Sequence, residues 1–229
     1  WDSQIRQRLV GKHPYPIDGS ELMLAEVLRD AGYHTAAVLP DAYFARSRWS
    51  GMTSGFTQVI ESPFTDRPAL PHNGARVTAA ATKVLEDPRQ APLFLWVHYY
   101  DAHSPHEQPE SSPVFGKSTR DVYDAELHFV DREVGTLLAA IERAFSGQAL
   151  VFVTGDHGIA FDAPRHEKFN YGYDLSTAVL HVPLIVHAPF LSARTLSGPV
   201  STMDIMPTIV NLLRMPGVFP LEGVSLVPE

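Results

Sequence analysis

Short apolar runs of strand length alternate along this chain of 229 residues with segments whose apolar residues recur at helical spacing. Pro92–Tyr100 (PLFLWVHYY) is a continuous apolar and aromatic run, which is typical of a strand buried on both faces. Further strands are predicted at His34–Leu39, Ala149–Thr154 and Val182–His187. Because helical segments separate these runs, we predict an α/β protein with a mostly parallel sheet flanked by helices on both faces.

Four helices are predicted from apolar periodicity, capping residues and glycine stops. They run from Ser20 to the residue before Gly32, over Gly74–Leu85 with Asn73 as the cap, over Ser118–Phe145, and over Ile205–Leu213 with Asp204 as the cap. The longest helix is predicted to bury Leu127, Val130, Val134 and Leu138, and to expose Arg120, Glu133 and Arg143. Residues 40–72 and 105–117 are predicted to be loops.

Composition excludes several classes of protein. The chain has 18 Lys and Arg against 26 Asp and Glu, a net charge of −8, so we expect no nucleic-acid partner. It has no cysteine, which excludes disulfides, thiolate zinc sites and a cysteine nucleophile and is compatible with the periplasmic or extracellular location that we favour. No apolar run approaches the ~18 residues of a membrane-spanning helix. We expect one α/β domain over residues 1–229, with an irregular segment at 1–19.

Polar residues able to bind a ligand follow two of the predicted strands. The first group is the stretch HYYDAHSPH around His103, and the second contains Asp156 and His157 between Gly155 and Gly158. Parallel sheets bind ligands beyond the carboxyl ends of their strands, so both groups are predicted to converge at one edge.

The pair Asp156-His157 has two interpretations. Beyond a strand end, flanking glycines allow the backbone to turn both side chains toward one point, where a carboxylate and a neutral imidazole suit a divalent cation. The alternative is an Asp–His hydrogen bond within a turn. His103 is similarly either an ordinary loop histidine or a donor to an anionic oxygen or a leaving group. Lys168 next to His166 is either a solvated charge or a contact for an anionic oxygen.

Five segments, in order, resemble the sulfatase branch of the alkaline phosphatase superfamily: HYYDAHSPH, YDAELHFVDREVGTLL, TGDHG, LSTAVLHVPLIVHAP and STMDIMPTIVNLL. The resemblance implies an alkaline-phosphatase/sulfatase-like fold in which Asp156 and His157 bind the active-site cation. It also implies that His103 contacts the sulfate or phosphate ester, together with Lys168 or His166. The cation is expected to be Ca²⁺ in a sulfatase, and Mn²⁺ or Zn²⁺ in a phosphotransferase.

The chain departs from the family at two places. The family's nucleophile and acidic metal ligands precede the segment AEVLRDAGY, and residues 1–19 contain no C-x-P-x-R-type motif. We therefore expect the fold to be incomplete at its N-terminus, with the missing N-terminal portion of the same polypeptide as its partner. Second, Tyr171, at an expected substrate-binding position, stands where many relatives have histidine.

The function predicted from the resemblance is that of part of a sulfatase-like hydrolase, which cleaves sulfate esters by metal-assisted nucleophilic attack. The expected substrates are small-molecule, glycan or lipid esters, and the isolated fragment is expected to be nearly inactive. Two alternatives remain: a phosphodiesterase or phosphoglycerol/phosphoethanolamine transferase of the same superfamily, and a non-catalytic relative that binds a ligand or partner.

Overall fold

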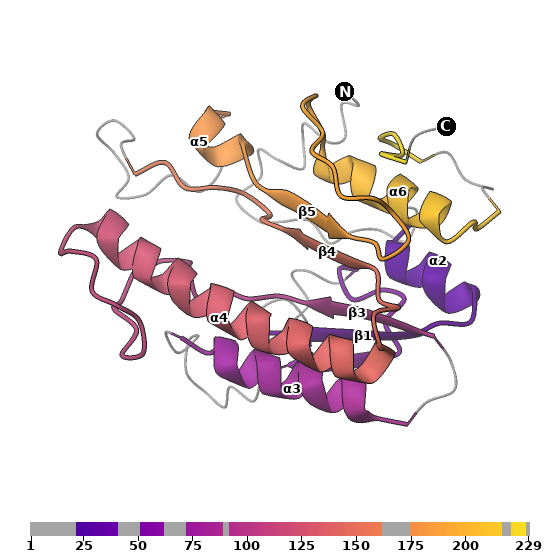
Figure 1. Ribbon diagram of the computed structural model, residues 1–229, viewed down its shortest axis with the longest axis horizontal. Coiled ribbons are helices and arrows are strands. Elements are labelled where there is room, and N and C mark those ends of the chain that lie inside the picture. Colours follow the sequence, from indigo (N-terminus) through magenta and orange to yellow (C-terminus); the bar gives the residue numbers. More distant parts are fainter. Residues whose placement is uncertain are drawn as a thin grey trace. The chain divides into compact units, whose positions relative to one another are not determined.

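The computed structural model describes residues 22–40, 51–61, 72–88, 92–161, 175–216 and 221–227 (Figure 1). Its chain forms two compact units, Trp1–Ser146 and Gly147–Glu229. We describe each unit by itself, and a single domain over residues 1–229 stays a prediction. The segment 1–19 lies outside the described residues.

The first unit contains a parallel sheet of three strands in the order β2-β1-β3. The strands are β1 (His34–Leu39), β2 (Gln58–Glu61) and β3 (Leu93–Val97). The central strand β1 is buried along almost its whole length, whereas β3 is half-buried throughout. The run Pro92–Tyr100 was predicted to be buried on both faces, but the residues of β3 are half-buried, and within the described residues β3 pairs with β1 alone. The strand β2 lies in a segment predicted to be loop, and its four residues were too few to detect.

Three helices pack against this sheet: α2 (Leu24–Asp30), α3 (Gly74–Glu86) and α4 (Thr119–Phe145). The helices α3 and α4 lie side by side along one face of the sheet, with α2 on the other side (Figure 1). Their shared core joins one face of β1 to α3 and α4 through Ala36, Val38, Val77, Ala81, Val84, Leu85, Leu137 and Ala140. The predicted α/β class, with a mostly parallel sheet flanked by helices, is confirmed.

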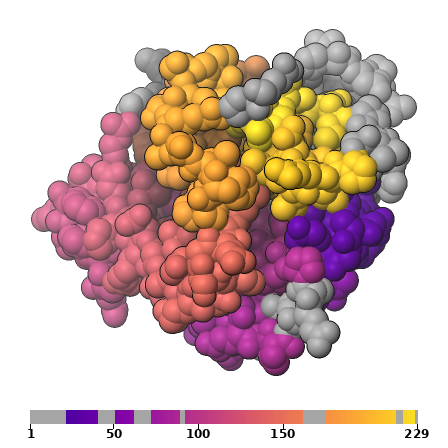
Figure 2. All heavy atoms as spheres, turned by 45° about the vertical axis from the view of Figure 1, so that its right-hand side comes forward, coloured from indigo at the N-terminus to yellow at the C-terminus, as the bar shows by residue number. Residues whose placement is uncertain are grey.

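The buried face of α4 differs from the predicted one. Its buried residues are Ala125, Glu126, Phe129, Glu133, Leu137 and Ala140. Arg120 and Arg143 are exposed as predicted, but Glu133 is buried, Val130 and Val134 are only half-buried, and Leu127 and Leu138 are 42% and 40% exposed. Most of the observed buried positions lie one residue before the predicted ones. Because each residue turns a helix by about 100°, the packed face is rotated by about that angle from the predicted face. Small alanines on the observed face allow α4 to lie close against α3, and the end of α4 reaches the surface beside α3 (Figure 2).

The second unit contains the antiparallel pair β4 (Val151–Thr154) and β5 (Leu184–His187). It also contains α5 (Thr177–Leu180), the 3₁₀ turn η2 (Thr202–Asp204) and α6 (Ile205–Leu212). Asp204 precedes α6 as predicted, but its carboxylate makes no cap there and accepts hydrogen bonds from the backbone of Ser201 and Val224.

Antiparallel pairing of β4 with β5 is a feature that the sequence did not predict, and the placement of all strands in one sheet stays a prediction because the two units are described separately. In the part of the chain that the structure describes, β3 pairs with β1, whereas β4 pairs with β5 in antiparallel register from Val151–His187 to Thr154–Leu184. The connection between β4 and β5 reverses the chain instead of crossing over, which apolar runs alone do not reveal. Within the described ranges, no helix combines the length and the apolar character needed to cross a membrane.

The observed face of α4 can be tested with two adjacent leucines. Leu137 is 7% exposed in the core, and Leu138 is 40% exposed. We expect Leu137→Ala to lower the free energy of unfolding by about 2–4 kcal/mol, because it leaves a cavity. Leu138→Ala, the matched control, should lower it by less than about 1 kcal/mol. Urea denaturation measures both values, and a greater loss for Leu138→Ala would restore the face that the sequence predicted.

Candidate functional site

The loop of residues 101–107, here called the histidine loop, follows β3 and begins at a buried carboxylate. Asp101 is 6% exposed, and its Oδ1 accepts a hydrogen bond from the backbone N–H of Gly74 at 2.8 Å. Asp101 thereby caps α3 from a distant part of the chain. The predicted cap, Asn73, makes no side-chain cap and instead donates its Nδ2 to the carbonyl of Pro40. Burial raises the pKa of Asp101, while the Gly74 N–H opposes that shift.

His103 is half-buried in the middle of the histidine loop. Its ring stacks on the ring of Tyr100, with the centroids 4.3 Å apart, and its backbone N–H donates to the Tyr100 carbonyl at 3.0 Å. The ring nitrogen Nδ1 lies 2.7 Å from the carbonyl oxygen of Ser104. Since a carbonyl only accepts, Nδ1 carries a hydrogen, and protonation of Nε2 then decides the charge of the ring. The loop therefore fixes both the orientation and the tautomer of His103.

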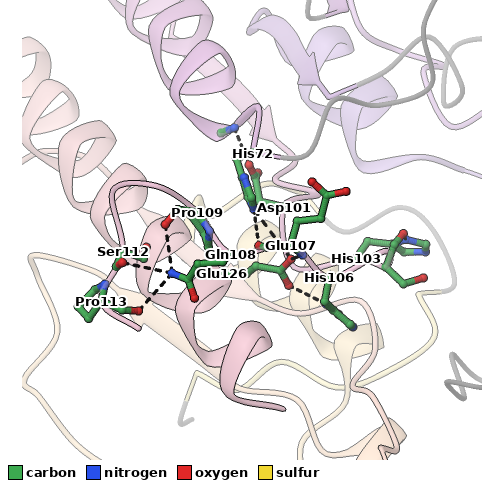
Figure 3. A network of polar contacts seen from close by, with 12 residues as sticks. His72, Asp101, His103, His106, Glu107, Gln108, Pro109, Ser112, Pro113 and Glu126 are labelled. Carbon is green, nitrogen blue, oxygen red and sulfur yellow. Dashed lines mark hydrogen bonds and ion pairs between the residues drawn. The ribbon is translucent and has the colours of Figure 1, made fainter. Parts of the chain in front are cut away.

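The end of the histidine loop is held by a second buried carboxylate, Glu126 of α4 (Figure 3). The Glu126 side chain is 1% exposed and accepts from His106 Nδ1 at 2.6 Å and from the backbone N–H of Glu107 at 2.8 Å. On the other side of the loop, His72 Nε2 donates to the Glu107 carbonyl at 2.8 Å. Burial raises the pKa of Glu126, and the hydrogen bonds from His106 and Glu107 counteract it.

The sequence did not single out Asp101, Glu126 or His72 as functional residues. One signal was present for Glu126, because an acidic residue beside the apolar Ala125 and Phe129 on a helix indicates a buried and partnered carboxylate. His72 has a left-handed backbone with φ 65°, a conformation that is uncommon outside glycine and that tertiary contacts sustain. The apolar periodicity of the sequence does not reveal a backbone conformation that depends on tertiary contacts.

Asp156 and His157 follow β4 directly, as predicted. The backbone N–H of His157 donates to Asp156 Oδ1 at 2.9 Å, and His157 Nδ1 donates to the Gly158 carbonyl at 3.0 Å. The atoms His157 Nε2 and Asp156 Oδ2 are 3.7 Å apart, which is too far for a hydrogen bond between the side chains. The Asp156 side chain is 67% exposed and that of His157 is 34% exposed. The turn is therefore made by bonds to the backbone.

This geometry fits two ligands of a divalent cation. Two atoms separated by 3.7 Å can both lie about 2.0–2.4 Å from one ion. With Nδ1 donating to Gly158, Nε2 of the neutral ring carries the lone pair that a metal requires. In the described residues, no group of three or more His, Asp or Glu side chains could hold a metal ion. The pair by itself could fill two positions of a coordination sphere.

The two glycines beside the pair have different roles. Neither has a positive φ, so the predicted conformational freedom is not what the turn uses. A Cβ on Gly158 would lie 2.1 Å from the carbonyl oxygen of Ala178 in α5, whereas a Cβ on Gly155 would lie 3.4 Å from the Val182 side chain. The Gly158 N–H also donates to the Val179 carbonyl at 2.7 Å. Close approach to α5 therefore requires glycine at position 158.

Other predicted site residues remain untested by the structure. Lys168, His166 and Tyr171 lie outside the described residues. His103 belongs to the first unit, and Asp156 and His157 belong to the second, so their convergence at one sheet edge stays a prediction.

Comparison with known proteins identifies the family of this chain. A sequence model of the family "Sulfatase" matches residues 3–215. The chain belongs to the sulfatase family. Arylsulfatase K of Gallus gallus is 29% identical over 134 residues, which are 58% of this chain and 24% of that protein. Arylsulfatase D of Homo sapiens is 26% identical over 196 residues, which are 79% of this chain and 32% of that protein.

A solved structure of a protein in the alkaline phosphatase superfamily from Vibrio parahaemolyticus is similar with a TM-score of 0.69 at 20% identity. The match covers 90% of this chain and 50% of the other, and it shows that the two share a fold. The predicted membership of the sulfatase branch is thus confirmed. The chain spans about a quarter to a third of the length of the two arylsulfatases and half of that structure.

The different space around Gly158 and Gly155 can be tested by substituting each with alanine. Gly158→Ala should lower the free energy of unfolding of the unit by about 1–3 kcal/mol, because the new methyl group meets backbone atoms of α5. Gly155→Ala is the matched control in the same turn and should cost less than about 1 kcal/mol, since its methyl group makes ordinary contact. Urea denaturation followed by circular dichroism gives both values. Equal losses would remove the special role of Gly158.

Proposed function

We propose that this sulfatase-family chain forms part of a hydrolase that cleaves sulfate esters with the help of a divalent cation. The observation that carries the proposal is the pair Asp156 Oδ2 and His157 Nε2, 3.7 Å apart, with the second ring nitrogen tied to Gly158. An anionic oxygen and a neutral imidazole nitrogen are suitable donors for such an ion. Membership of the sulfatase family supports the reaction class.

Asp156 and His157 would hold the cation, which we propose to be Ca²⁺. Bound there, it would supply Lewis-acid polarisation of the ester and lower the pKa of the attacking group. A hard cation takes about six or more oxygen ligands, so two side chains bind it weakly by themselves. We propose that further ligands and the nucleophile come from a segment preceding Ser20, and that the isolated chain is nearly inactive.

His103 would contact the ester group. Its Nδ1–H is committed to the Ser104 carbonyl and its ring rests on Tyr100, so the imidazolium form would present Nε2–H in a fixed direction. A positioned donor of this kind stabilises the charge that develops on the sulfate oxygens or on the leaving group. Lys168 or His166, with Tyr171, would complete the contacts to the ester. The substrate would be a small-molecule, glycan or lipid ester.

Metal binding provides the first test. In the full-length protein, we expect calorimetry to detect Ca²⁺ binding that Asp156→Asn weakens at least about tenfold, because a carboxylate ligand is lost. Affinity should also fall at acid pH, since a protonated imidazole at His157 cannot ligate. Asp131→Asn, which changes an exposed aspartate of α4, is the matched control and should leave affinity unchanged. Equal affinity in Asp156→Asn and the unaltered protein would show that Asp156 is no ligand.

Ester hydrolysis provides the second test. We expect the full-length protein to hydrolyse 4-nitrophenyl sulfate faster than 4-nitrophenyl phosphate, and His103→Gln to lower kcat/KM about 10²–10⁴-fold through loss of a positioned acid. His187→Gln, at an exposed position of β5, is the matched control. Preference for the phosphate ester would instead favour a phosphodiesterase or phosphotransferase. Absence of hydrolysis of either ester would favour a non-catalytic relative.

A further inference from the structure

We propose that Glu126 is a positioning residue for His103: it fixes the end of the histidine loop from α4 and so sets where the His103 ring lies. The proposal rests on the proposed function, in which His103 contacts the ester. Glu126 itself is buried and bonded to His106 and Glu107, so it acts through the loop and touches no ester.

The histidine loop is anchored at both ends by buried carboxylates. At its start, the Asp101 carboxylate accepts the N–H of Gly74 at the beginning of α3. At its end, the Glu126 carboxylate on α4 accepts bonds from His106 and Glu107. His103 lies between these anchors in the sequence, and its ring lies to one side of the cluster around Glu126 (Figure 3). Since α3 and α4 pack together through the core, both ends of the histidine loop are attached to the same packed pair of helices.

The backbone of Glu107 is held on both sides by side chains. Its N–H donates to Glu126 Oε1 at 2.8 Å, and its carbonyl accepts from His72 Nε2 at 2.8 Å. His72 Nε2 is in turn 3.9 Å from Glu126 Oε1. Both polar backbone atoms of this loop residue are therefore satisfied by side chains, of Glu126 in α4 and of His72 just before α3. Such a residue has little freedom to shift while these bonds persist.

The burial of the Glu126 carboxylate couples it to the histidine loop. A buried carboxylate is costly unless hydrogen bonds replace its water, and each Glu126 oxygen accepts a bond from the histidine loop. The carboxylate and the loop are thus coupled, because neither moves without breaking bonds that compensate the burial. Glu133, on the same buried face of α4, has instead an ion-pair contact with its neighbour Arg132 at 3.6 Å. Glu126 is therefore distinguished from Glu133 by its partners.

The anchor at His106 and Glu107 is linked to His103 by a short segment. Ser104 and Pro105 alone separate His103 from His106, and the ring of Pro105 restricts the backbone φ. His103 Nδ1 donates to the carbonyl of Ser104, inside this short segment. A displacement at His106 and Glu107 is therefore passed to the imidazole of His103. Displacements of about 1 Å in a catalytic group can reduce turnover by about 10²-fold.

The variant Glu126→Gln tests this link with little change of volume. Its single amide oxygen can still accept from Glu107, so the bond to His106 survives only if the imidazole changes tautomer and Nδ1 accepts from the amide NH₂. In the full-length protein with Ca²⁺ and 4-nitrophenyl sulfate, we expect kcat to fall about 10–100-fold. Glu133→Gln, the matched control on the same helix, should change kcat less than about twofold. Thermal unfolding verifies that each variant is folded at the assay temperature.

A double variant separates positioning from general destabilisation. If Glu126 acts through His103, adding Glu126→Gln to His103→Gln should change kcat by less than about twofold, because the group being positioned is already gone. Multiplicative losses would overturn the proposal, and so would an unchanged kcat in Glu126→Gln alone. Should Glu126→Gln fail to fold, His106→Gln, which removes one of the two donors, replaces it with the same expectations and the same contradicting results.

A spectroscopic readout keeps this inference distinct from the proposed function. With ¹⁵N-labelled histidine, Glu126→Gln should shift the imidazole signals of both His106 and His103, and Glu133→Gln should shift neither. Unchanged His103 signals in Glu126→Gln would overturn the positioning role whatever the activity. In contrast, full activity in His103→Gln would overturn the proposed function of His103 while leaving the structural link measurable by this spectrum.

Discussion

Two buried carboxylates, Asp101 and Glu126, hold the candidate site of the first unit together. Each accepts at least one backbone N–H from an element distant in sequence, Gly74 for Asp101 and Glu107 for Glu126. Buried charge requires such partners, and burial raises the pKa of both carboxyl groups despite them. The start of α3, the N-terminal part of α4 and the loop after β3 are therefore fixed relative to one another by the need to satisfy these oxygens.

Packing around the first carboxylate depends on a glycine. A Cβ at Gly74 would lie 3.0 Å from Asp101 Oδ2 and 3.0 Å from Phe129 Cε1, so a larger residue would press on both the cap and α4. Phe129 also meets the ring of His72 edge to face, with centroids 5.8 Å apart. The apolar core and the polar site therefore share residues at the N-terminal end of α3. The same interface that buries α4 aligns the bonds that hold the histidine loop.

The pair in the second unit is organised differently. Two bonds of the pair join neighbours in the sequence, from the His157 N–H to Asp156 Oδ1 and from His157 Nδ1 to the Gly158 carbonyl. Contact with α5 then fixes the turn through Gly158. A constellation of this kind is visible in a short sequence motif, which is why Asp156 and His157 could be proposed from the pattern TGDHG. The network around Glu126 joins residues 19 or more positions apart and leaves no comparable motif.

The sequence by itself determined the α/β class, the family, four of the five strands that the structure describes, and helices such as α4, whose predicted start at Ser118 is a capping residue bonded to Asp121. These features follow from local propensity and apolar periodicity, which act over a few residues. Tertiary structure decided which face of α4 is buried, which strand is central, how β4 and β5 pair, and that Asp101 instead of Asn73 caps α3. Those choices depend on close packing and on partners for buried polar atoms, and both are properties of elements brought together across the chain.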